Sequence, residues 1–138
     1  MSLSFTGKFN NASNLASLTN RLKDPTHVYM GFATVTIGDT DDLSTITEST
    51  AIARFEVTSS LGTSALDGGV PKLKNSSDIT SGNATIGGQA IVSWFLTTVA
   101  AASVGEIICY GDIDSGAAYT NVGFPFKALT GSLTTSID

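Results

Sequence analysis

The sequence predicts a mainly β protein: an antiparallel β-sandwich, with a jelly roll among the topologies it permits, and one short N-terminal helix. Two observations support this prediction. Charged residues make up only 14% of the 138 residues, against a usual share of about 25%, and Thr, Ser, Gly and Ala take their place. Short apolar segments, about seven to nine in all, recur at regular spacing between turn residues, which is typical of a sandwich. The length fits one domain.

Residues 1–9 are predicted to form an N-terminal arm, and residues 10–138 a single β-sandwich domain. The arm is mostly polar but contains Phe5 and Phe9. Apolar anchors of this kind tie a terminus down, so the arm either adds a strand to a sheet edge or docks onto a neighbouring molecule.

Asn10–Lys23 is the one segment that favours a helix. Leu15, Leu18 and Leu22 recur at helical spacing and form a single apolar stripe. The Asp-Pro pair that follows ends the helix, because the residue before a proline is disfavoured in the helical conformation.

The remaining apolar segments are predicted to be strands. AIARFEVT, at residues 51–58, alternates as expected for a half-exposed strand of an antiparallel sheet. The predicted strands span residues 26–37, 51–58, 78–86, 89–99, 104–113, 122–128 and 133–137.

Residues 90–113 are the most apolar stretch and contain the only tryptophan, Trp94, and the only cysteine, Cys109. Apolar residues on both faces of residues 89–99 are typical of a central strand that is covered on both sides. We therefore expect two adjacent strands here that form the core, with Trp94 buried.

Residues 59–78 are the longest weakly structured stretch, and loops of this length in compact domains are usually functional or mobile. Apolar residues punctuate this loop, as they do the arm. The predicted interface residues are Phe5 and Phe9 in the arm, and Leu61, Leu66, Val70 and Leu73 in the loop.

Composition excludes several classes of partner. A net charge of −5 gives no electrostatic footprint for nucleic acid, and no basic amphipathic segment suits a membrane surface. The apolar run at residues 90–105 is shorter than the ~20 residues that span a bilayer, and no secretory signal is recognised. A single cysteine excludes an intrachain disulfide. No phosphate-binding or dinucleotide motif is present, so no cofactor is expected.

No catalytic signature is present either. His27, the only histidine, would have to lie beside Cys109 to form a nucleophile–base pair; we expect instead a strand-end histidine and a buried structural cysteine. A glycan hydrolase needs two carboxylates facing each other across a cleft, and no spacing in the sequence places two together. The chain is therefore expected not to be an enzyme and to have no catalytic residue.

Asp39, Asp41 and Asp42 form an acidic turn whose oxygens suit Ca²⁺. The EF-hand pattern fails here, since Ser44 and Thr50 stand where that loop needs Gly and Glu. Aspartate is also favoured in turns for local hydrogen bonding. No metal site is predicted, and calcium binding at this turn is left open. Asp112 and Asp114 form a second acidic pair.

Several segments, taken in order, resemble a family of short virion proteins of tailed bacteriophages, described as tail-fibre-like or capsid decoration (cement) proteins. SLTNRL precedes VYMGFAT, AIARFEVT and NSSDITSGNAT follow, and IICYGDIDSG and GSLTTSID close the chain. The resemblance covers residues 15–138. The chain departs from the family at SWF (residues 93–95), where members often have a strand that contains histidine.

The resemblance implies a non-enzymatic structural protein located in the virion, a decoration protein that binds the exterior of the capsid shell and stabilises it. Its partners would be the major capsid protein or other virion proteins, and it would assemble as a homotrimer. The alternative is a tail fibre or tail-tip component that takes part in host attachment. A sandwich would also permit a lectin-like module, which no aromatic cluster supports.

Overall fold

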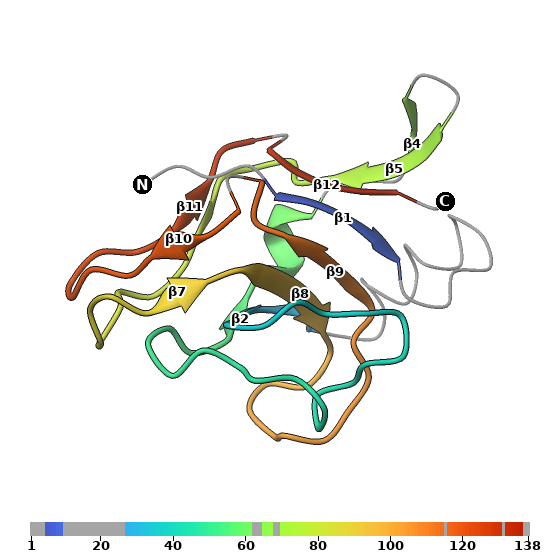
Figure 1. The fold of residues 1–138 in the computed structure, drawn as a ribbon. Coiled ribbons are helices and arrows are strands. Elements are labelled where there is room, and N and C mark those ends of the chain that lie inside the picture. Colours follow the sequence, from blue (N-terminus) through green and yellow to red (C-terminus); the bar gives the residue numbers. More distant parts are fainter. Residues whose placement is uncertain are drawn as a thin grey trace.

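The computed structural model describes residues 5–9, 27–61, 65–67, 70–114, 116–130 and 132–136. It confirms a mainly β protein built largely of antiparallel strand pairs (Figure 1). The predicted helix at Asn10–Lys23 lies outside the described residues and stays a prediction. The described part contains a single helical element, the 3₁₀ turn η1 at Thr58–Ser60. No helix in that part is long and apolar enough to cross a membrane.

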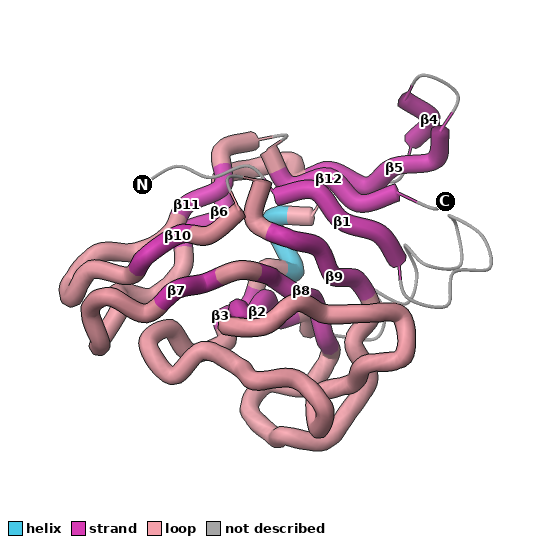
Figure 2. Tube along the Cα trace, viewed as in Figure 1, coloured by secondary structure: helices cyan, strands magenta, loops and turns pink. Residues whose placement is uncertain are grey.

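An eight-stranded sheet forms the body of the described structure. From edge to edge its strands are β3 (Phe55–Glu56), β2 (Tyr29–Ala33), β8 (Ser93–Thr97), β9 (Cys109–Asp112), β1 (Phe5–Phe9), β12 (Leu133–Ser136), β5 (Val70–Lys74) and β4 (Ala65–Asp67). Two short sheets accompany it: β7 (Ala90–Ile91) with β10 (Ala118–Tyr119), and β6 (Ile79–Thr80) with β11 (Lys127–Ala128). Figures 1 and 2 show both short sheets at the same end of the molecule.

Strand β1 lies inside the large sheet. It pairs in parallel with β12, where Phe5 is opposite Leu133, and antiparallel with β9, where Phe9 is opposite Cys109. Over these residues the predicted N-terminal arm is an inner strand, because its backbone groups complete the hydrogen bonding of two neighbours. The β1–β12 pair is also the one parallel ladder among the described strands, where the sequence predicted antiparallel pairing.

The predicted central strand pair is confirmed. β8 pairs antiparallel with β2 on one side and with β9 on the other, and all five of its residues are buried. Trp94 and Leu96 pack into one core cluster, whereas Phe95, on the alternate face, packs into a second. Burial on both faces is what a covered inner strand requires.

Other segments differ from the prediction. Residues 59–78 were predicted to be a weakly structured loop in which residues 70–73 could pair with a sheet edge. They contain most of η1 and the hairpin β4–β5, and β5 covers residues 70–73. Conversely, the predicted strands at residues 51–58 and 122–128 shrink to the two residues of β3 and the two of β11. Figure 2 shows the long loops, and two of them meet where the N–H of Leu43 donates to the C=O of Gly105 at 3.0 Å.

Candidate functional site

The predicted interface residues fall in three different places. Phe5 and Phe9 lie on the inner strand β1. The side chain of Leu61 lies in the core, because the residue is only 2% exposed, so it belongs to no outer surface of this chain. Leu66, Val70 and Leu73 lie on the hairpin β4–β5, at the outer edge of the large sheet.

His27 and Cys109 occupy different environments. His27 is exposed, and its Nδ1 lies 2.9 Å from Oε1 of Glu56. Cys109 is fully buried on β9, where it faces Leu96 of β8 across the ladder. The geometry therefore supplies no cysteine–histidine pair of the kind that nucleophilic catalysis uses.

Two carboxylates of the acidic turn, those of Asp41 and Asp42, accept hydrogen bonds from donors within the turn itself. Asp41 accepts hydrogen bonds from the N–H of Gly38 at 2.8 Å and the hydroxyl of Thr45 at 2.9 Å. The hydroxyl and N–H of Ser44 both donate to Asp42 and hold the pKa of that carboxyl below its usual value. These bonds are the local turn chemistry for which aspartate is favoured.

Asp39 accepts a hydrogen bond from the phenol of Tyr110, which reaches it from β9. Burial, together with the neighbouring carboxylate, raises the pKa of Tyr110, so the phenol stays a donor. Across the described part of the chain, no group of three or more His, Cys, Asp or Glu side chains is placed to hold a metal ion. The described contacts of Asp39, Asp41 and Asp42 are hydrogen bonds within the turn and to Tyr110.

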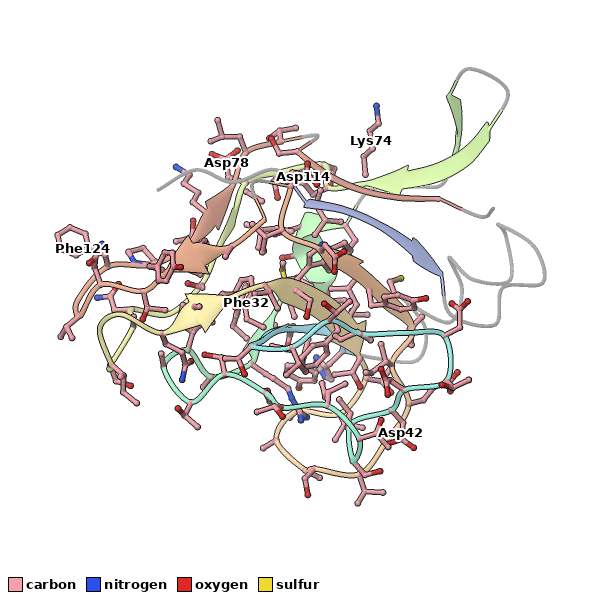
Figure 3. The ribbon with its side chains drawn as sticks, viewed as in Figure 1. Phe32, Asp42, Lys74, Asp78, Asp114 and Phe124 are labelled. Atoms are coloured by element: carbon pink, nitrogen blue, oxygen red, sulfur yellow. The ribbon has the colours of Figure 1, made fainter. Side chains whose placement is uncertain are left out.

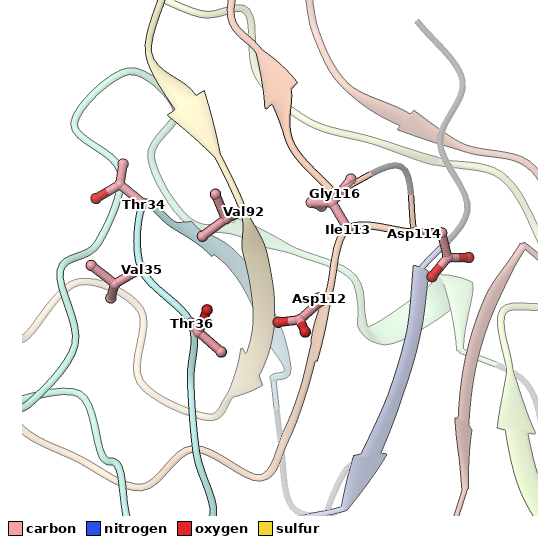
Figure 4. A pocket seen from close by; sticks show the side chains of 8 residues that line it. All are labelled: Thr34, Val35, Thr36, Val92, Asp112, Ile113, Asp114 and Gly116. Carbon is pink, nitrogen blue, oxygen red and sulfur yellow. The ribbon is translucent and has the colours of Figure 1, made fainter.

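An open groove of about 600 Å³ lies beside β9 (Figure 4). Its lining combines hydroxyls, carboxylates and methyl groups, from Thr34, Val35, Thr36, Val92, Asp112, Ile113, Asp114 and Gly116. Figure 4 shows Asp112 directed toward Thr36, while Asp114 lies on the other side of the chain. The two carboxylates do not face each other, so the groove lacks the acid–base pair of glycoside hydrolysis.

A second surface is the end of the molecule formed by residues 81–91 and 117–126, which we call the apolar tip. Four large apolar side chains are exposed there: Ile86 at 46%, Tyr119 at 60%, Val122 at 63% and Phe124 at 66%. Figure 3 shows Phe124 at the extremity of this end. Single exposed apolar residues are common, but these four lie on two segments that backbone hydrogen bonds join, such as Gly88 N–H to Thr120 C=O at 2.7 Å, so the apolar tip is the second candidate surface.

The apolar tip was not predicted from the sequence. Residues 122–128 were predicted to be a strand, which would have placed every second apolar side chain inside. Two features of the sequence indicate the tip: neither segment contains a charged residue, and each contains glycine, namely Gly82, Gly87 and Gly88 in the first and Gly123 in the second. Gly88 and Gly123 adopt positive φ values of 76° and 83°, which favour turns.

Comparisons of the chain with protein-family models, with curated proteins and with solved structures found no match.

Proposed function

We propose that this chain is a non-enzymatic structural protein of a tailed-bacteriophage virion, a decoration protein that binds the exterior of the capsid shell and stabilises it. Two things support the proposal: the ordered segments that resemble such proteins, and the position of the hairpin β4–β5. That hairpin lies in the stretch that the sequence predicted to be a contact surface.

The free edge of β4 is the observation that carries the proposal. Within the described residues β4 pairs only with β5, and Figure 1 shows the hairpin extending away from the body. An edge strand presents unpaired N–H and C=O groups, and a strand from another protein binds there by adding to the sheet. A decoration protein gains stable attachment from such a contact without any chemical step.

We also propose that the fold is a β-sandwich. One core cluster joins residues of the large sheet, such as Trp94 and Leu96, to Ile79 and Ala128 of the sheet β6–β11 and to Ile91 and Ala118 of the sheet β7–β10. Two layers that share one apolar core are the defining feature of a sandwich, and a jelly roll is one of the topologies that it permits.

The partners in this proposal are the major capsid protein or other virion proteins, and the assembly is a homotrimer. Three copies held together bind their sites with avidity, so a weak contact per copy suffices. The second candidate is a fibre or tail-tip component that helps to engage the host. The free edge of β4 suits either location.

Copy number separates the two candidates. We expect quantitative mass spectrometry of purified particles to find hundreds of copies of the chain, and cryo-electron microscopy to place them on the shell. A few copies at the tail would favour the second candidate, and absence from purified particles would contradict both.

The edge contact is tested by Leu66→Lys, because lysine on an edge strand is how natural sheets block strand addition. We expect occupancy on the particles to fall by about tenfold or more, which corresponds to ~1.4 kcal/mol of binding free energy. Leu66→Val keeps an apolar residue in the strand and should bind like the wild type. Equal occupancy for all three proteins would rule out β4 as the attachment edge.

A further inference from the structure

We propose that the apolar tip is a second attachment point: a preformed hydrophobic knob that inserts into an apolar, uncharged pocket on a neighbouring protein of the virion. This inference rests on the proposed function, because it assumes that the partner is another protein of the virion. It assigns an interaction role to Ile86, Tyr119, Val122 and Phe124, none of which was among the predicted interface residues.

Charge defines the chemistry of the partner. Residues 81–91 and 117–126 contain no charged side chain, although the chain as a whole has a net charge of −5. Burying a charge without a partner is costly, and a surface free of charge avoids that cost on docking. The complementary site must be free of unpaired charge for the same reason, so an apolar pocket fits and a basic or acidic patch does not.

Hydrogen bonds hold the two loops of the tip together before it binds. The N–H of Ala84 donates to the C=O of Phe124 at 3.0 Å, and the N–H of Gly123 donates back to the C=O of Ala84 at 2.9 Å. The buried Thr120 donates its hydroxyl to the C=O of Ile86 at 2.7 Å. Both loops are thereby tied together at several points, which reduces the entropy lost when the knob docks.

The exposed area argues for a pocket rather than a second tip. From the exposed fractions, the four side chains present on the order of 400 Å² of apolar surface, if a whole aromatic side chain counts for roughly 150–250 Å². A stable interface buries about 800 Å² on each partner. Two convex tips would share even less than their exposed area, whereas a concave pocket surrounds aromatic side chains on all sides and makes them the dominant contacts.

The tip and the free edge of β4 lie at opposite ends of the molecule. Figure 1 shows the loops beyond β7 and β10 at one end and the hairpin β4–β5 projecting at the other, and Figure 3 shows Phe124 far from that hairpin. A chain attached at both ends bridges two neighbouring subunits. Such a bridge would stabilise a shell by cross-linking it.

The test uses particles prepared without this chain, to which the purified full-length protein is added and its binding measured by co-sedimentation. Phe124→Asp introduces a charge at the tip, and we expect it to weaken binding about tenfold or more. Leu129→Asp is the matched control, because Leu129 is 44% exposed and lies outside both tip segments. Circular dichroism confirms that each variant is folded.

The outcomes are distinguishable. Wild-type binding that Phe124→Asp weakens and Leu129→Asp leaves unchanged supports the knob. Wild-type binding that is unchanged by Phe124→Asp overturns the knob but leaves the proposed function intact. Failure of the wild type to bind the particles contradicts the proposed function itself. Two further measurements compare the wild type with Phe124→Asp: self-association by analytical ultracentrifugation, and binding to phosphatidylcholine vesicles. If Phe124→Asp abolishes self-association or vesicle binding and leaves particle binding unchanged, the inference is overturned.

Discussion

At the scale of single residues, Arg54 holds its charge inside the protein. Its side chain is 3% exposed, and its guanidinium donates to both carboxylate oxygens of Glu48, at 2.8 and 2.6 Å. A third bond runs to the C=O of Val99 at 2.9 Å. Glu48→Ala would leave this buried cation without a counter-charge, so we expect a loss of about 3 kcal/mol in the free energy of unfolding, measured by urea denaturation.

The exposed pair between His27 and Glu56 provides the control for that prediction. Both of its side chains are about half exposed or more, so Glu56→Ala should cost less than about 1 kcal/mol. The double variant Arg54→Met with Glu48→Ala removes both charges and should recover part of the loss. Equal costs for Glu48→Ala and Glu56→Ala would show that burial adds nothing to the Arg54–Glu48 pair.

Side-chain burial could be predicted from the sequence in strands where successive apolar side chains alternate between the two faces. Trp94, Phe95 and Leu96 alternate between two core clusters as the pattern of an inner strand indicates. Phe124 and Tyr119 could not be placed in this way, because hydrophobicity by itself favours burial. Their exposure depends on a left-handed turn at Gly123 and on backbone bonds to a distant segment, which no local pattern encodes.

At the scale of elements, Thr120 fastens together the two segments of the apolar tip. It is 1% exposed, and its hydroxyl accepts the N–H of Gln89 at 3.0 Å and donates to the C=O of Ile86 at 2.7 Å. Thr120→Val keeps the shape but loses both bonds, which leaves two partly buried backbone groups without this partner. We expect a loss of about 1–3 kcal/mol in the free energy of unfolding and faster hydrogen exchange in residues 81–91.

Thr130→Val is the matched control, because the hydroxyl of Thr130 is exposed and bonds Asp78 at 3.1 Å. Water can replace that bond, so the change should be within about 0.5 kcal/mol. If Thr120→Val were equally mild and left exchange unchanged, the tip would be held by something other than this hydroxyl.

Strand existence was easier to predict than strand length. Residues 51–58 alternate like a full strand, yet only Phe55–Glu56 pair. The hydroxyl of Ser49 accepts the N–H groups of Ala51 and Ile52, at 3.1 and 3.3 Å, and bends the chain before a ladder can form. Side-chain bonds to nearby backbone compete with sheet pairing in this way, and their outcome depends on tertiary neighbours such as Gln89, which bonds Ala51.

At the scale of the whole molecule, the order of strands in the large sheet could not be predicted from the sequence. Consecutive strands usually lie next to each other, yet β1 lies between β9 and β12, which come from the second half of the chain. The five residues of β1, FTGKF, contain no pattern that selects those partners. The choice is set by two ladders formed at long range. The sequence of the segment by itself predicted a strand at a sheet edge or a docking arm, whereas β1 is an inner strand.

Strand β1 joins two halves of the sheet, and Lys8→Pro tests this role. Lys8 is opposite Tyr110 on β9 and Ser136 on β12, so a proline there removes an N–H from an inner strand and restricts its backbone. We expect a loss of about 2 kcal/mol or more in the free energy of unfolding. Lys8→Thr keeps the N–H and suits a strand, so it should unfold like the wild type.

Hydrogen exchange identifies which strands Lys8→Pro destabilises. Without β1 the large sheet separates into β3-β2-β8-β9 and β12-β5-β4, so protection in Lys8→Pro should fall in β9 and in β12 together. The second of these groups contains the hairpin β4–β5 and contacts the core through Leu133 of β12, so the β1 ladder adds to that contact. If Lys8→Pro instead kept wild-type stability and protection, the pairing of residues 5–9 would be dispensable, and the β5–β12 ladder with Leu133 in the core would hold the hairpin.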